Sequence, residues 1–311
     1  MLFPGQGSQF VGMGKLLLEY PNVRDIYKLA SKILGYDLIE VCLKGPKSLL
    51  DKTLYCQPAV VVTSLAAIEK LKYDNPKAIE SCITTAGYSV GEISALVFAG
   101  SLSIEDAIYL VKYRSEAMQK VSEGTPGSMM VVFISPSTKL NFACHASKLY
   151  CKQELKMEEV VCEISNYLHP GCKVVAGNSQ ALKFIEKNAK EFEIRRTSYL
   201  PVSGAFHSKL MQPVVEMLKS KISSLKINDP VVPVHSNVTG ARFKNADDIR
   251  KLILKQICMP VKWEQTLHSI YARPQGKNFP RTFEVGPGKQ MGALLKMVNA
   301  KAFEEYQNVD V

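Results

Sequence analysis

The stretch Gly87-Tyr88-Ser89-Val90-Gly91 constrains the fold of this chain more than any other. A strand-like run, residues 81–86, precedes it, and a helix-like run, residues 92–98, follows it. The order strand, G-x-S-x-G turn and helix is typical of a nucleophile elbow, which holds a serine hydroxyl clear of the sheet. Glycines flank the serine because side chains there would collide with the strand and the helix. The pattern predicts a serine nucleophile; an ordinary glycine turn is the alternative.

Composition and charge limit the classes of protein to which this chain could belong. Of the 311 residues, 46% are hydrophobic and 22% are charged, which is ordinary for a globular chain with one large or two smaller domains. No apolar run is long enough to cross a bilayer, so we expect no membrane partner. The eight cysteines form no C-x-x-C pair, which favours reduced core thiols over metal ligands. The net charge of +10 is scattered, so we expect an acidic protein or a phosphorylated substrate rather than nucleic acid.

Strand-like and helix-like segments alternate through most of the chain, which predicts an α/β fold with a mostly parallel sheet. Residues 128–198 differ, because their apolar spacing predicts the order β-α-β-β-α-β of a ferredoxin-like α+β unit. We therefore expect a large α/β domain, residues 1–127 and 199–311, with a small inserted domain, residues 128–198. The expected strands are 2–3, 81–86, 129–134, 160–165, 173–176, 197–202, 231–235 and 282–285, and the expected helices are 23–34, 57–73, 104–121, 138–151, 179–192, 208–224, 246–258 and 261–272.

The glycine-rich loop after the first strand does not fit a nucleotide site. Met13 and Gly14 occupy the positions of the Lys and Ser/Thr of a phosphate-binding loop, and Phe10 replaces the third glycine of a dinucleotide fingerprint. Gln6 remains, at the strand end where open α/β sheets bind ligands. Its amide is a candidate donor to an oxyanion, and a solvated turn glutamine is the alternative.

Arg114 lies on the apolar stripe of the helix predicted over residues 104–121. A buried guanidinium without a partner costs several kcal/mol, so it must meet a carboxylate. That carboxylate belongs either to the chain, as an internal salt bridge, or to a substrate. The planar guanidinium of arginine can bind a substrate carboxylate through two parallel hydrogen bonds.

A serine nucleophile needs a base, and the chain has five histidines. His207 follows a strand at the expected ligand edge, and we choose it over His235, which also ends a strand. No acidic residue is clearly placed to orient His207, so a backbone carbonyl is expected to do so.

The motifs together resemble the malonyl-CoA:acyl carrier protein transacylases, particularly the mitochondrial enzymes of animals, over nearly the whole chain. The motifs that carry the resemblance are Pro4-Gly5-Gln6-Gly7-Ser8-Gln9, Gly87-Tyr88-Ser89-Val90-Gly91-Glu92, Arg114 with Met118, Gly204-Ala205-Phe206-His207-Ser208, Ser236-Asn237-Val238, Gln256 with Pro260-Val261 and Trp263, and Glu284-Val285-Gly286-Pro287-Gly288. One position departs from the family, which usually has histidine where this chain has Tyr88.

The resemblance implies a hydrolase-like large domain with a ferredoxin-like insert, and a role for each matched residue. Ser89 attacks the malonyl thioester, His207 accepts its proton and the backbone carbonyl of Gln256 orients His207. Gln6 and the Val90 amide form the oxyanion hole. The substrate-binding residues implied are Arg114, Met118, Phe206 and Asn237. Arg114 would bind the malonyl carboxylate, and the Phe206 ring would leave little room for a 2-methyl group.

The resemblance also implies the partners. The substrate is malonyl-CoA, and the acceptor is the phosphopantetheine thiol of acyl carrier protein, so that the product supplies fatty acid synthesis. No tightly bound cofactor or metal, a monomeric state and a location in the mitochondrial matrix are expected, although no presequence is recognisable among the residues. A serine thioesterase or hydrolase with the same Ser89–His207 pair is the alternative function.

Overall fold

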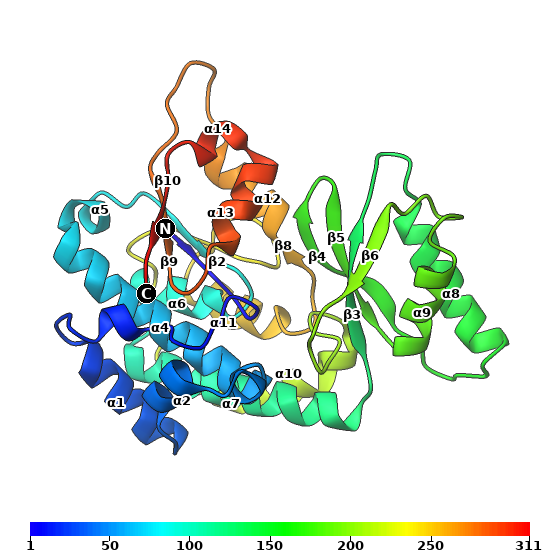
Figure 1. Cartoon of the computed structure of the whole chain (residues 1–311), viewed down its shortest axis with the longest axis horizontal. Helices are drawn as coiled ribbons and strands as arrows, with labels where there is room; N and C mark the ends of the chain where they lie inside the picture. Colours follow the sequence, from blue (N-terminus) through cyan, green and yellow to red (C-terminus); the bar gives the residue numbers. More distant parts are fainter.

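Two sheets organise the computed structural model, which describes all residues 1–311 (Figure 1). The first has five strands in the order β10-β9-β1-β2-β7, and every neighbouring pair is parallel. Its strands are β1 (Leu2–Phe3), β2 (Thr85–Gly87), β7 (Val234–His235), β9 (Thr282–Val285) and β10 (Tyr306–Val309). Because β1, β2 and β7 are neighbours, the loops that leave their carboxyl ends meet at one edge of the sheet.

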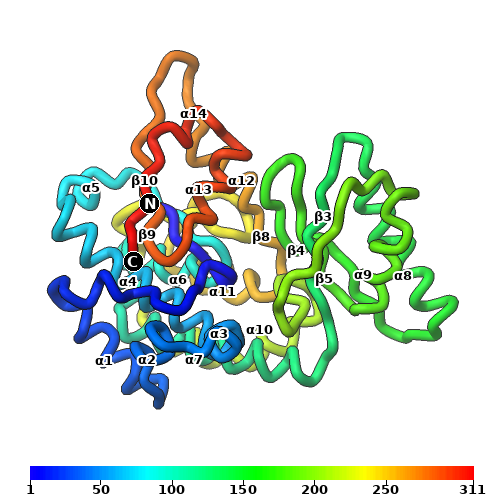
Figure 2. The backbone as a smooth tube through the Cα atoms, in the orientation of Figure 1, coloured from blue at the N-terminus to red at the C-terminus, as the bar shows by residue number.

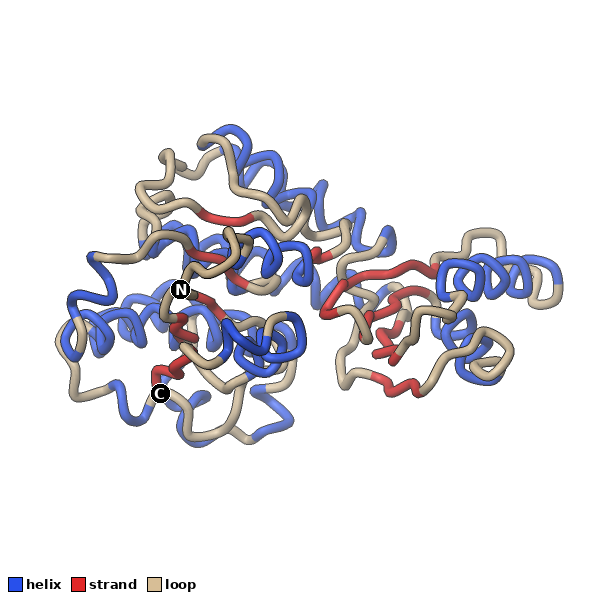
Figure 3. Tube along the Cα trace, turned by 90° about the horizontal axis from the view of Figure 1, so that it is seen from above, coloured by secondary structure: helices blue, strands red, loops and turns tan.

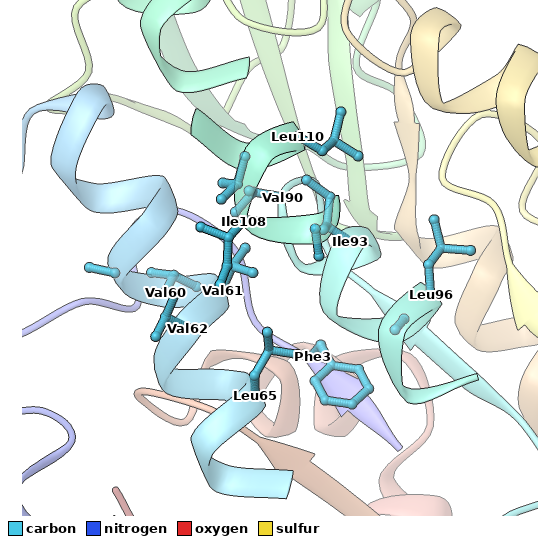
Figure 4. Packing of buried hydrophobic residues seen from close by; sticks show 14 of the residues in the cluster. Phe3, Val60, Val61, Val62, Leu65, Val90, Ile93, Leu96, Ile108 and Leu110 are labelled. Carbon is cyan, nitrogen blue, oxygen red and sulfur yellow. The ribbon is translucent and has the colours of Figure 1, made fainter. Parts of the chain in front are cut away.

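Helices surround the parallel sheet and bury its apolar side chains. The longer ones are α1 (Val23–Leu34), α4 (Thr53–Asp74), α6 (Gly91–Phe98), α7 (Ile104–Gly124), α10 (Gln212–Ser223), α11 (Ala246–Lys255), α12 (Trp263–Tyr271) and α13 (Gln290–Val298). Figure 4 shows side chains of α4, α6 and α7 packing with Phe3 of β1 into the largest core cluster. None of the helices combines the length and apolar composition that crossing a bilayer requires.

The second sheet lies to one side of the first, as the smooth backbone trace makes clear (Figure 2). Its order is β6-β3-β5-β4-β8, with antiparallel pairs except for the parallel pair β4/β8. The strands are β3 (Ser128–Phe133), β4 (Cys162–His169), β5 (Cys172–Gly177), β6 (Arg196–Tyr199) and β8 (Val261–Lys262).

Helices α8 (Leu140–Gln153) and α9 (Ser179–Lys187) lie on the face of the second sheet that points away from the parallel sheet (Figure 3). Alternation along β3 explains this arrangement, because successive side chains of a strand point to opposite faces. Met130 and Val132 pack in the cluster under α8 and α9, whereas Met129 packs in the large core.

The observed elements differ from the expected ones in a few places. Strand β2 begins at Thr85 rather than Ser81, and strand β4 continues through two irregularities to His169. The predicted helix 261–272 begins instead with β8, because Val261 pairs with Asn166 of β4. Strand β10 and the short helices α2 (Leu38–Lys44), α3 (Lys47–Leu50), α5 (Pro76–Glu80) and α14 (Ala300–Phe303) were not predicted, since each is too short to show a clear period.

Candidate active site

Ser89 lies in a tight turn between β2 and α6, with a left-handed φ of 52°. The two flanking glycines are required by close backbone approaches. A Cβ on Gly87 would lie 1.9 Å from the carbonyl oxygen of Gly91, and a Cβ on Gly91 would lie 2.4 Å from that of Pro4. The strand, turn and helix therefore form the elbow that the sequence predicts, and the strained φ turns the Ser89 side chain out of the helix.

His207 contacts Ser89 directly. Its Nε2 lies 2.7 Å from Ser89 Oγ, and its Nδ1 lies 2.7 Å from the carbonyl oxygen of Gln256. The carbonyl only accepts hydrogen bonds, so Nδ1 carries the proton and Nε2 is free to accept one from Ser89. Burial and then the Arg114 charge lower the pKa of His207 to about 3, against the hydrogen bond to Gln256. The imidazole is thus held neutral, with Nε2 unprotonated.

His235 does not share this position. It is buried in β7, where its Nδ1 lies 3.4 Å from the carbonyl oxygen of Gly240. Its Nε2 has no hydrogen-bond partner, and none of its hydrogen bonds reaches the elbow.

Arg114 projects from α7 into the same site and is only 3% exposed. Its Nη1 donates to Gln57 Oε1 at 2.6 Å, and its Nη2 lies 3.2 Å from Ser89 Oγ and 3.1 Å from Gln256 Oε1. No carboxylate lies within 4.0 Å of the guanidinium, so the internal salt bridge is not formed. Neutral amides hold a buried cation beside the candidate nucleophile, an arrangement that can accept an anionic group.

Gln6 follows β1, and its side chain is held by residues of α4. Its side-chain amide donates to Thr53 Oγ1 and accepts from Gln57 Nε2, both at 3.2 Å. The backbone N–H groups of Gln6 and Val90 donate to no acceptor within the chain. These two backbone donors, one at the start of α6, are therefore free for a ligand oxygen.

The remaining predicted substrate residues are of two kinds. Met118 and Phe206 are buried in the large core, and Met118 Sδ lies 3.5 Å from Gln57 Nε2. Asn237, in contrast, is fully buried behind the elbow: its Oδ1 accepts from the Ser89 N–H and its Nδ2 donates to the Gly87 carbonyl, both at 2.7 Å. Asn237 therefore braces the elbow through both of its polar atoms, and substrate binding by this residue stays a prediction.

Two residues at the site were missed as functional candidates. Gln57, before Pro58 in α4, links Arg114 to Gln6. Glu92, in the first turn of α6, is a fully buried carboxyl whose Oε2 accepts from the Asn237 N–H at 2.6 Å. Burial raises the pKa of Glu92 to about 8, against the hydrogen bonds from Asn237 and Gln256 and the Arg114 charge. A charged side chain in the apolar run of α6 was the signal that could have marked Glu92.

Tyr88 connects the elbow to the second sheet. Its hydroxyl lies 2.7 Å from Nδ2 of Asn166 on β4, and its ring meets that of Trp263 edge-on with centroids 5.5 Å apart. The side chain thus points away from the Ser89–His207 pair. No group of three or more histidines, cysteines or acidic side chains lies close enough together to hold a metal ion.

Comparisons with known proteins agree with this geometry. The acyl transferase domain family matches residues 1–279. The chain is 52% identical to the human protein named malonyl-CoA-acyl carrier protein transacylase, mitochondrial, over 311 residues, covering all of this chain and 80% of that protein. A crystal structure of an acyl carrier protein S-malonyltransferase from Vibrio cholerae matches with a TM-score of 0.87 and 31% identity, covering 99% of this chain and 95% of that one.

A further solved structure contains a carrier protein. It is described as a type II PKS acyl-carrier protein in complex with its malonyl-transacylase, and it matches with a TM-score of 0.83 and 30% identity over 99% of this chain and 94% of that one. The fold, the Ser89 elbow and the sequence identity all indicate the same family. The chain therefore belongs to the acyl transferase family, among the malonyl-CoA-acyl carrier protein transacylases.

Proposed function

We propose that this chain is an acyltransferase that moves the malonyl group from malonyl-CoA to the phosphopantetheine thiol of acyl carrier protein, through a malonyl ester on Ser89. The observation that carries the proposal is the buried Arg114 guanidinium 3.2 Å from Ser89 Oγ with no carboxylate paired to it. A free cation beside a serine nucleophile suits an acyl group that itself ends in a carboxylate. The names of the relatives support this choice of substrate.

In the first half-reaction, Ser89 Oγ attacks the thioester carbonyl while its proton passes to Nε2 of His207. The backbone N–H groups of Gln6 and Val90 donate to the oxyanion of the tetrahedral intermediate. The carbon–sulfur bond then breaks, and the CoA thiolate leaves with the proton from His207. The malonyl ester on Ser89 remains.

The second half-reaction reverses these roles with a new thiol. His207 Nε2 takes the proton of the phosphopantetheine thiol, whose sulfur attacks the ester carbonyl on Ser89. The same two N–H groups stabilise the intermediate. The carbon–oxygen bond to Ser89 breaks, Oγ recovers its proton from His207, and the malonyl thioester leaves on the carrier protein.

Selectivity is assigned to three side chains around the acyl group. Arg114 binds the malonyl carboxylate through its two terminal nitrogens, which Gln57 and Gln256 hold in position. Met118 and the Phe206 ring close the apolar sides of the pocket, and the ring excludes a 2-methyl substituent.

The proposed domain division places a ferredoxin-like insert at residues 128–198 within a hydrolase-like large domain, residues 1–127 and 199–311. It is supported by the order β6-β3-β5-β4 and by the two helices on one face. Strand β8, which lies outside the insert in sequence, extends its sheet.

The proposed partners and location follow the relatives. The net charge of +10 suits an acidic carrier protein, and one related transacylase was solved with its acyl-carrier protein. The human relative is named as mitochondrial, which supports a mitochondrial location, and we propose the matrix as the compartment. We further propose that the chain acts as a monomer without a tightly bound cofactor.

Intact-protein mass spectrometry tests the function. Malonyl-CoA should add one malonyl group to the chain, Ser89→Ala should prevent this, and acyl carrier protein in its phosphopantetheine form should remove the group and gain its mass. Rapid loss of the group as free malonate without an acceptor would indicate a thioesterase instead. Absence of any adduct would remove Ser89 as the nucleophile.

A further inference from the structure

Glu92 is an acidic side chain with no exposed surface, and the reaction described above does not use it. Its two oxygens have separate donors: Oε2 accepts from the Asn237 N–H at 2.6 Å, and Oε1 accepts from Nε2 of Gln256 at 3.0 Å. Both oxygens of Glu92 therefore act as hydrogen-bond acceptors in the folded chain. An acidic side chain is costly to bury, which points to a purpose beyond packing.

The contacts of Gln256 fix which way its amide points. On one side, Nε2 lies 3.0 Å from both the Ser89 carbonyl oxygen and Glu92 Oε1, which can only accept. On the other side, Oε1 lies 3.1 Å from Nη2 of Arg114, which can only donate. The reverse orientation would set donor against donor and acceptor against acceptor. Glu92 thus supplies one of the two acceptors that turn the amide oxygen of Gln256 toward Arg114.

We propose that Glu92 is a positioning residue for recognition of the acyl carboxylate, acting through the side chain of Gln256 on Arg114. The proposal rests on the proposed malonyl transfer. Gln256 Oε1 accepts from Nη2 of Arg114 and so holds that nitrogen beside Ser89 Oγ. The other terminal nitrogen, Nη1, is held by Gln57 Oε1. Loss of that acceptor would leave the guanidinium free to turn away from the acyl group.

Glu92→Gln tests this because it keeps the shape and changes only the donor and acceptor pattern. A glutamine at 92 that still accepts from Asn237 presents its amino group to Gln256, whose amide must then turn over. Arg114 would face a donor instead of an acceptor. We expect the ratio of kcat/KM for malonyl-CoA to that for acetyl-CoA to fall roughly tenfold or more.

Two further variants separate positioning from packing. Glu92→Asp retains a carboxyl oxygen that can accept from Gln256, so its malonyl-to-acetyl ratio should stay within about threefold of the wild-type value even if both rates fall. Glu284→Gln is the matched control: Glu284 is also fully buried, and it accepts from the N–H groups of Met291 and Gly292 away from the elbow. That variant should leave the ratio unchanged.

An unchanged ratio in a folded Glu92→Gln protein, with both rates lowered equally or not at all, would overturn the proposal. If that variant does not fold, Gln256→Met makes the same test, since it removes the same acceptor from Arg114 and keeps the backbone carbonyl on His207. An unchanged ratio there would also overturn it. Failure of the proposed function is distinguishable, because the wild-type chain would then form no malonyl adduct.

Discussion

The amide of Asn166 lies 2.7 Å from the hydroxyl of Tyr88, so one hydrogen bond joins the second sheet to the residue that precedes Ser89. The Trp263 ring, directly after β8, packs against the same tyrosine. Tyr88 therefore ties the second sheet to the elbow, through its hydroxyl and through its ring.

We expect Tyr88→Phe to lower the free energy of unfolding by about 1 kcal/mol, the usual net value of a buried hydrogen bond. In a double-mutant cycle with Asn166→Ala, measured by urea unfolding, the coupling should be about 0.5–1.5 kcal/mol. Tyr27→Phe is the control, because that hydroxyl pairs with Thr63 and its effect should add to that of Asn166→Ala. Simple additivity for Tyr88 and Asn166 would show that the contact contributes nothing.

Arg114→Ala should lower kcat/KM for malonyl transfer by about 10²–10³-fold, because the acyl carboxylate loses a charged, two-pronged partner. Transfer of an acetyl group should be unchanged or faster, since acetyl has no carboxylate. Arg250→Ala serves as the control, as Arg250 binds the backbone carbonyls of Ile222 and Leu225. Equal losses for both acyl groups would contradict the assignment of Arg114 to substrate.

Gly87→Ala should destabilise the chain by on the order of 3 kcal/mol or more, because the added Cβ would lie 1.9 Å from the Gly91 carbonyl oxygen and 2.3 Å from the Glu92 nitrogen. The backbone of the elbow would have to move, and serine reactivity should fall with it. Gly124→Ala is the matched control in the last turn of α7, where a Cβ meets no atom within 4 Å. A fully stable Gly87→Ala protein would show that the turn is not tightly packed.

The pKa of His207, lowered to about 3 by burial and by the Arg114 charge, predicts the pH dependence of Ser89 reactivity. The folded imidazole stays neutral well below the usual pKa of about 6.5. Labelling of Ser89 by a small fluorophosphonate should therefore show no inflection between about pH 6 and 7. An acid limb centred there would mean that His207 titrates normally.

The same shift affects stability with a definite sign. Unfolding exposes His207, which then binds a proton below about pH 6.5, so its contribution to stability is complete above that pH and is lost as the pH falls toward 3.

Glu92 affects stability in the opposite direction. Its pKa is raised from 4.5 to about 8, so its contribution is complete below pH 4.5 and is lost as the pH rises through 8. Between about pH 5 and 8 the wild-type chain should lose stability more steeply than Glu92→Gln in thermal unfolding. Equal slopes would contradict the raised pKa.

Local sequence predicted much of the fold because local sterics decide it. The Gly87-x-Ser89-x-Gly91 turn follows from which residues tolerate a close backbone approach, and the long helices α1, α4 and α7 follow from apolar spacing. The two-residue strand β8 and the strand β10 were not predictable in this way. The equally short strands β1 and β9 were predicted, but β8 lay within a predicted helix and β10 contains the polar pair Gln307-Asn308. Both become strands by pairing, β8 with β4 and β10 with β9.

The site divides in the same way. The sequence by itself determined a serine on a strained turn and a cation on a buried helix face, because residue type and helical periodicity fix those two properties. The strand expected before His207 ends earlier, at Tyr199, and belongs to the second sheet. Only the tertiary structure decided that His207, 118 residues away, lies 2.7 Å from Ser89, and that Arg114 meets amides instead of a carboxylate. The tertiary structure also placed Asn237 behind the elbow, and it placed Glu92 within hydrogen-bond distance of Gln256. Hydrogen bonds between distant segments depend on how strand ends and helices pack, and no local pattern encodes that packing.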